Sequence, residues 1–207
     1  MRLADTPAPA RAAGHPDAFT AASAAFEAGR DAVAAVRSDL EFEAWPAPKR
    51  LAPHAVALAV TAYRDGTEAG TGKLVLLYDP AGHEGWAGTF RLVVQVQADV
   101  EEEMAADPLL GEVGWSWLTE ALDQHAPGYR AVSGTVTRVI TEGYGAKADD
   151  PPVTAFDLRA SWSPAPDDDT AVEIGGAVAA WCELLVAACG LPATGTTALG
   201  SARRRRS

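Results

Sequence analysis

The chain has few cysteines and no long apolar run. Cys182 and Cys189 lie seven residues apart in a helical pattern, which gives neither a CxxC motif nor a disulfide framework. We interpret both as small core residues in a reducing compartment. The N-terminus lacks the apolar run of a signal peptide, and no stretch approaches the roughly 18 apolar residues of a membrane span. These absences predict a soluble cytoplasmic protein without a membrane partner.

Motifs for catalysis and metal binding are also missing. The sequence contains no GxSxG, no Walker-type GxxxxGK[ST] and no GxGxxG after a strand. Its four histidines are scattered, without HExxH or i,i+4 spacing, and we expect surface or loop roles for them. They are His15, His54, His83 and His125. The sequence therefore predicts neither a metal nor a cofactor.

Positive charge is scarce in the body of the chain. There are three lysines, and the formal net charge is −11. Four of the arginines, Arg203 to Arg206, stand together near the C-terminus, so the rest of the chain carries about −15 (−11 minus 4). An acidic surface repels phosphate backbones, so we do not expect the folded part to bind nucleic acid.

What the chain does contain is enough apolar material for one core. Hydrophobic residues make up 48% of its 207 residues, which is typical of a single globular domain. We predict a disordered Ala/Pro-rich segment over residues 1–14, a domain over 15–191, and a flexible tail over 192–207 that ends in the arginine run.

Helical periodicity appears three times. The 3/4 spacing of apolar residues predicts a first helix from Pro16 to about Arg37. A second helix is predicted in "MAADPLLGEVGWSWLTEALD" (104–123), behind an Asp-Pro start. A third is predicted to start at Thr170, with Thr170 and Glu173 as a capping box, and to stop before Gly190 and Pro192.

Alternating patterns predict six strands, and their order defines the fold class. The strands are expected at 40–45, 55–63, 72–79, 86–100, 129–144 and 153–162. The resulting order is α-β-β-β-β-α-β-β-α, without a βαβ rhythm. It predicts an α+β fold, an antiparallel sheet of about six strands with helices packed on it. The order also loosely resembles the secretion-chaperone arrangement, with an extra leading strand.

Two tryptophans stand one residue apart in the second helix. On a helical projection, Trp115 and Trp117 lie on opposite borders of an apolar arc of roughly 160°. Both rings could simply seal the helix onto the sheet, or one border could form a recognition groove. We expect Trp117 in the core and Trp115 partly exposed, and we take both, with Trp86, as candidate binding residues.

The segment 79–86 is the best candidate for a catalytic loop. Asp79, His83 and Glu84 gather side chains that can hold metals or move protons. The alternative is a hairpin loop with solvated charges, in which Asp79 opens a turn and glycines supply special backbone angles. A further acidic group, Glu101 to Glu103 with Asp107, is expected to favour the start of the second helix through the helix dipole.

Four blocks of the sequence resemble a known family. They are "PAPKRLAPHAVAL", "LLYDPAGHEGWAGTFRLV", "MAADPLLGEVGWSWLTEALD" and "SGTVTRV", in this order. Together they resemble the actinobacterial domain-of-unknown-function family numbered three thousand, over roughly residues 16–165. The resemblance implies a soluble intracellular protein of high-GC Gram-positive bacteria. It implies no reaction and no functional residues.

Three functional hypotheses follow. The first is a non-enzymatic protein-interaction or chaperone-like module, because six tryptophans stand against few catalytic candidates in an acidic, soluble body. The second is a small enzyme that uses the 79–86 loop. The third is an RNA-process accessory protein that uses Arg203, Arg204, Arg205 and Arg206. The sequence indicates neither the partner nor the oligomeric state.

Overall fold

The protein folds as an α+β domain, seen here in a computed structural model that describes residues 16–165 and 170–193. A six-stranded antiparallel sheet has four helices packed on it, in the order α-β-β-β-β-α-α-β-β-α. The fold class predicted from the sequence is confirmed. The predicted disordered segment 1–14, with His15, and the arginines 203–206 lie outside the described residues.

All neighbouring strands of the sheet are antiparallel. Its order is β1-β2-β3-β4-β6-β5, so β1 and β5 are the two edges. The strands are β1 (Leu40–Trp45), β2 (His54–Arg64), β3 (Thr67–His83), β4 (Gly88–Asp99), β5 (Arg130–Thr141) and β6 (Val153–Ser163). Each predicted strand is therefore present.

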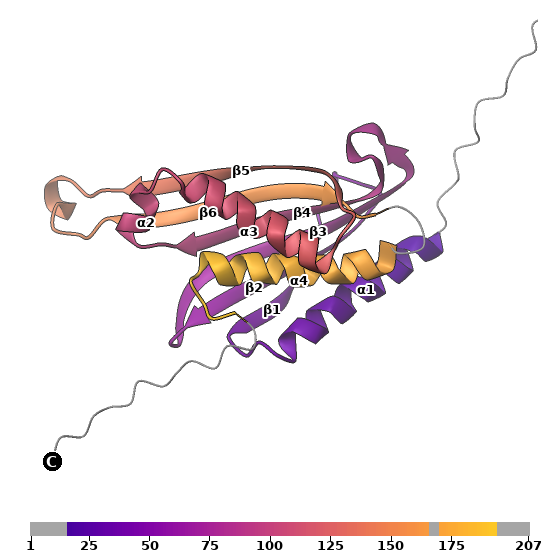
Figure 1. The fold of residues 1–207 in the computed structure, drawn as a ribbon, viewed down its shortest axis with the longest axis horizontal. Coiled ribbons are helices and arrows are strands. Elements are labelled where there is room, and N and C mark those ends of the chain that lie inside the picture. Colours follow the sequence, from indigo (N-terminus) through magenta and orange to yellow (C-terminus); the bar gives the residue numbers. More distant parts are fainter. Residues whose placement is uncertain (1–15, 166–169, 194–207) are drawn as a thin grey trace, which may run out of the picture.

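Three long helices cover one face of this sheet (Figure 1). They are α1 (Pro16–Ala34), α3 (Leu110–His125) and α4 (Thr170–Ala188), and a short helix, α2 (Glu102–Ala106), lies beside β5 and β6. The helix α4 runs between α1 and α3 and contacts both, as well as β3 and β4. It is therefore the central element of the helical layer.

One predicted helix is two helices in the structure. The segment 104–123 was expected to be continuous, but α2 ends at Ala106 and α3 begins at Leu110. Pro108 has no backbone N–H and disfavours helical angles at the residue before it. The carboxylate of Asp107 accepts a hydrogen bond from the Leu109 amide at 2.8 Å, which forms a turn at this break.

The hairpin between β2 and β3 is tighter than predicted. The strands predicted at 55–63 and 72–79 left the residues between them for a turn, whereas the turn in the structure consists of Asp65 and Gly66, with φ of 53° and 81°. Such a two-residue turn matches the right-handed twist of the strands. β3 therefore pairs with β2 from Thr67 onward and continues through part of the predicted loop, as far as His83.

The core lies between the sheet and α4. Inward residues of the four inner strands are almost fully buried: Leu58, Val60, Leu74, Leu76, Leu92, Val94, Phe156, Leu158 and Trp162. They meet the apolar side of α4, where Ile174, Val178 and Trp181 are completely buried. Alternation along the strands and 3.6-residue periodicity along the helix thus produce one continuous core.

The apolar composition of α4 has a second consequence. Among the described residues it is the one helix long and apolar enough to cross a membrane, although the sequence analysis expected no such stretch. Alanine, valine and glycine raise its hydropathy despite the acidic Glu173 and Glu183. Most of this helix is buried inside the domain, and a core helix passes the same test of length and composition.

Candidate functional site

A groove between α1 and α4 forms a cavity of about 750 Å³. The two helices lie close together near the N-terminus of α4 and diverge toward their C-terminal ends (Figure 1). The residues that line the groove are Gly29, Ala32, Val33, Val36, Arg37, Leu40, Gln124, His125, Gly175, Ala179, Cys182, Glu183, Val186, Ala187, Leu191 and Ala193.

Two glycines set the narrow end of this groove. A methyl group at Gly29 would stand 2.6 Å from the carbonyl oxygen of Gly175 and 3.2 Å from Cβ of Val178. The backbones of α1 and α4 can therefore touch only because position 29 has no side chain. Beyond this contact the helices separate, and the space between them becomes the groove.

The walls of the groove are mainly aliphatic. Alanine and valine side chains of α1 and α4 face each other, and Leu40 and Leu191 close the wide end. Val36 is 65% exposed, which is unusual for a large apolar side chain next to a core. A cavity of this size and character binds apolar groups, with a few polar groups to orient them.

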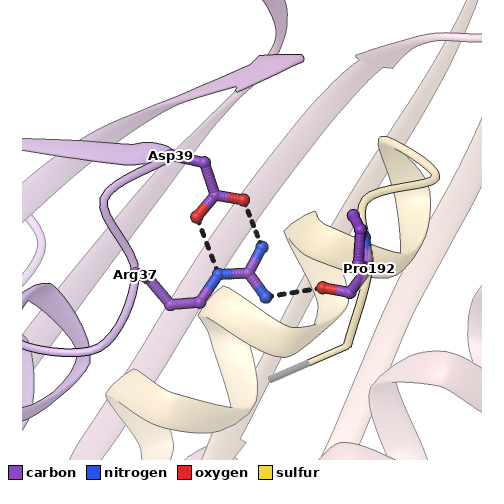
Figure 2. A network of polar contacts seen from close by, with 3 residues as sticks. All are labelled: Arg37, Asp39 and Pro192. Carbon is purple, nitrogen blue, oxygen red and sulfur yellow. Dashed lines mark hydrogen bonds and ion pairs between the residues drawn. The ribbon is translucent and has the colours of Figure 1, made fainter. Parts of the chain in front are cut away.

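One lining residue of the groove, Arg37, makes a network of polar contacts (Figure 2). The Arg37 guanidinium donates to both carboxylate oxygens of Asp39, at 2.8 and 2.5 Å, and to the carbonyl oxygen of Pro192, at 2.9 Å. The hydrogen bond from Arg37 lowers the pKa of the Asp39 carboxyl. The first residues of the predicted flexible tail, from Pro192, are thereby held against the connection between α1 and β1.

A histidine and a glutamate form a second polar pair at the groove. Nε2 of His125, the last residue of α3, lies 2.5 Å from a carboxylate oxygen of Glu183 on α4. Their side chains are 29% and 46% exposed, so this pair stands in contact with water. It joins residues 58 positions apart and could not be recognised as a pair from the sequence.

Both cysteines are free and buried, as the sequence indicated. Cys182 lines the groove, and burial raises the pKa of its thiol well above the ordinary value. Burial also raises the pKa of Cys189 to about 11. Because the thiolate is the reactive form, neither side chain is prepared to act as a nucleophile or metal ligand.

The side chains of the 79–86 loop are engaged within the loop itself. Asp79 accepts a hydrogen bond from the Ala81 amide at 2.9 Å, and Nδ1 of His83 accepts one from the Gly85 amide at 3.2 Å. His83 also stacks on Trp86, with ring centroids 5.1 Å apart. None of Asp79, His83 and Glu84 lines either of the two described cavities. The loop geometry matches the hairpin alternative.

The paired tryptophans each cover a different strand. Trp115 packs over Gly134 of β5, where a methyl group would stand 2.8 Å from the indole ring. Trp117 packs against Phe156 of β6, with ring centroids 6.0 Å apart. Both side chains are partly buried, so the expectation that Trp117 is a fully buried core residue is wrong. Trp115 is thus partly exposed as expected, and both rings lie where α3 covers the β5–β6 border of the sheet.

A second, smaller cavity of about 380 Å³ lies beside the N-terminus of α4. Gly88, Thr89, Arg130, Ser163 and Thr170 are among its lining residues. The Ser163 hydroxyl donates to the carbonyl oxygen of Trp86 and accepts from a guanidinium of the sheet, that of Arg91. Three aspartates, residues 167–169, follow in the sequence between two of its lining residues.

The remaining acidic and histidine residues have structural surroundings. Glu102 and Glu103 lie in the first turn of α2, where their negative charges interact favourably with the helix dipole, as expected. His54 is exposed, and its ring makes tilted contacts with the rings of Phe19 and Tyr78. Over residues 16–165 and 170–193, no group of three or more His, Cys, Asp and Glu side chains could hold a metal ion.

Fold and groove together define an α+β domain with an apolar groove in its helical layer. The chain belongs to the family described as Protein of unknown function (DUF3000), whose model matches residues 2–197, nearly the whole chain. The resemblance noted in the sequence is thereby confirmed. No curated protein and no solved structure matches the chain.

The sequence analysis missed the groove. A usable signal was present, because Gly29 and the Gly175–Gly176 pair stand inside predicted helices, where glycine is unfavourable unless packing requires it. These glycines indicate close helix contacts. Where two helices touch at one end, a space can open at the other.

Proposed function

We propose that this protein is a non-enzymatic protein-interaction module that holds an apolar segment of another protein in the α1–α4 groove. The observation that carries the proposal is a cavity of about 750 Å³ whose walls are mainly aliphatic, with a few polar side chains. Apolar segments bind to such grooves through a few anchoring side chains, as amphipathic helices do in other helix-in-groove complexes.

The charge of the protein favours a particular partner chemistry. The formal net charge is −11. Glu183, whose side chain is 46% exposed, adds a carboxylate to the lining of the groove itself. An acidic surface attracts positively charged partners and speeds their association. We therefore expect the bound segment to carry basic residues beside its apolar anchors.

The ionisable groups of the groove support binding in preference to catalysis. The Arg37 guanidinium is occupied by Asp39 and Pro192, and burial raises the pKa of the Cys182 thiol. Apart from Cys182, the described lining residues offer no serine, threonine or lysine nucleophile to the exposed pair of His125 and Glu183. The groove is thus suited to recognise apolar surface.

A pair of model peptides tests this function. Both are amphipathic helices about 16 residues long with the same Leu/Ala face, one with lysine flanks and one with glutamate flanks. Fluorescence anisotropy should show saturable binding of the lysine-flanked peptide, with the glutamate-flanked peptide at least about 10-fold weaker. Ala179→Trp, which fills the groove, should abolish binding.

Ala28→Trp is the matched control, because Ala28 is exposed on α1 and does not line the groove. It should bind the peptide like the wild type. Equal binding to Ala179→Trp, or no binding by the wild type, would show that the groove is not a peptide site. A variant without residues 198–207 reports whether the chain's own tail, which follows the groove residue Ala193, competes for the same space.

The RNA hypothesis remains a prediction about the tail. Arg203–Arg206 lie outside the described residues, so the structure offers no support for or against contacts with RNA. A filter-binding measurement with single-stranded RNA at two salt concentrations tests it, since binding through arginines should weaken strongly with salt and disappear when the four arginines are removed.

A further inference from the structure

The two edges of the sheet differ in how they are protected. β1 is six residues long, carries the exposed acidic Glu41 and Glu43, and is followed directly by Pro46. Short length, charge and proline are the usual means of preventing an edge from pairing with another chain. The β1 edge therefore has ordinary protection.

β5 differs from β1 in its length and composition. It has 12 residues without lysine, acid or proline, and it is rich in β-branched side chains, "RAVSGTVTRVIT". Its pairing with β6 is regular from Ser133 to Thr141, and no strand in the described part of the chain pairs with its other side. Near its start the strand has an irregularity between Arg130 and Ser133, where Ala131 has a positive φ of 50°. A long edge strand that is regular beyond this point is a site for adding another strand.

The charges of β5 are tied back to the domain. Its two charged residues are Arg130 and Arg138. The Arg138 guanidinium donates to the carbonyl oxygen of Asp107 at 2.6 Å, and that of Arg130 donates weakly to the carbonyl oxygen of Pro164. The middle of the edge, residues 133–137, is thus neutral and largely composed of serine, threonine and valine.

Exposed apolar side chains collect along the same edge. α2 contacts β5, and the start of α3 lies beside it (Figure 1). Of the eleven exposed large apolar residues among the described residues, seven belong to β5, its hairpin with β6, or these helices: Met104, Leu109, Val113, Val139, Ile140, Tyr144 and Val153. This concentration indicates a surface that is covered in an assembly.

We infer that β5 pairs antiparallel with β5 of a second copy, so that two sheets become one. The strand is self-complementary when the two-fold axis passes at Val136, near its middle. Arg138 then lies opposite Gly134 of the partner copy, a position that has no side chain and is covered by Trp115. Thr135 lies opposite Thr137, a favourable cross-strand pair. No like charges meet, as an isologous interface requires.

This interface is independent of the proposed peptide groove. The groove is lined by Leu40 of β1 and lies toward the opposite edge of the sheet. A dimer through β5 would therefore carry two separate grooves. Failure of either proposal leaves the other standing.

A charge-swap experiment on the full chain tests the dimer and its register. Thr135 and Thr137 are exposed, and the proposed register places each opposite the other in the partner copy. We expect the wild type to sediment as a dimer over a series from about 1 to about 500 μM. Thr135→Lys/Thr137→Lys and Thr135→Glu/Thr137→Glu should each be monomeric, and an equimolar mixture of the two should dimerise again.

Thr67→Lys/Gln97→Lys is the control with the same added charge as the lysine variant, placed at exposed positions away from β5. It should remain dimeric, and thermal melting should show that all variants stay folded. A monomeric wild type at every concentration would overturn the inference, as would a dimer that survives both double substitutions. A mixture that stays monomeric would overturn the register and with it the proposed pairing.

Discussion

The helix α4 has two neighbours, and the two contacts have different outcomes. On the side of α1, Gly175 meets Gly29, and the helices then diverge into the groove. On the side of α3, the next residue, Gly176, faces the carbonyl oxygen of His125, where a methyl group would overlap the backbone. Two adjacent glycines of α4 thus contact two different neighbouring helices.

The polar contacts on the two sides differ in burial. The Arg37 side chain, on the α1 side, is 8% exposed and joins Asp39 to the chain after α4. The pair of His125 and Glu183, on the α3 side, is open to water. Glycine contacts thus position the helices, whereas a partly buried ion pair holds the wide end of the groove.

The largest effect should come from the α3 side. Gly176→Ala places a methyl group on the backbone of His125, so α3 and α4 must separate. We expect a loss of about 3 kcal/mol or more in the free energy of unfolding, measured by urea denaturation. Gly175→Ala is the matched control, because its methyl group would meet only ordinary contact at 3.4 Å. It should be neutral or gain up to about 1 kcal/mol from helix propensity.

The second-largest loss of stability should come from the partly buried pair of Arg37 and Asp39 on the α1 side. Asp39→Asn leaves the Arg37 guanidinium without its counter-charge, and we expect a loss of about 2 kcal/mol at pH 7. The pKa of Asp39 is lowered in the folded state, so its stabilisation is present above the unfolded value of 3.8 and disappears as the pH falls through the folded value. Urea midpoints of the two proteins should therefore converge as the pH falls below the folded pKa of Asp39. Parallel curves at all pH values would contradict this account.

A smaller loss is expected at the narrow end of the groove. In Gly29→Ala, the methyl group stands 2.6 Å from a carbonyl oxygen, but α1 ends near its contact with α4 and can shift. Crowding of about 2 kcal/mol is partly offset by up to about 1 kcal/mol of helix propensity. Thermal melting should place this variant between the wild type and Gly176→Ala. A loss as large as that of Gly176→Ala would show that the two sides of α4 are equally rigid.

The smallest effect on stability should come from the exposed pair. Glu183→Gln removes one charge from a solvent-accessible contact, and such pairs contribute about 0.5 kcal/mol or less. Denaturation should barely change, while binding of the lysine-flanked peptide should weaken several-fold because a carboxylate at the groove is lost. Gln124→Glu, which adds a charge at a neighbouring lining position, should have the opposite effect on binding.

Several elements of the fold could be predicted because their signals are local. Alternation predicted all six strands, and 3/4 spacing predicted α1, α3 and α4. The division between α2 and α3 was missed, although Pro108 carried the signal. The burial of Cys182 and Cys189 was correctly expected from their place on an apolar helix face.

The candidate site could not be predicted in the same way. The contact of Arg37 with Pro192 spans 155 residues, and that of His125 with Glu183 spans 58. No short window of sequence contains both partners. The loop 79–86, in contrast, gathers its side chains within one short window, so it could be recognised in the sequence. In the structure Asp79 and His83 accept hydrogen bonds from amides of the loop itself.

The sequence by itself determined the class of fold, the order of its elements and which face of each is apolar, because these properties depend on periodicity and backbone preference over a few residues. Only the tertiary structure decided that α4 lies between α1 and α3, that its two glycines contact different helices, and that β5 is a free edge. Those outcomes depend on how distant segments pack, and packing is settled by the shape of the whole core.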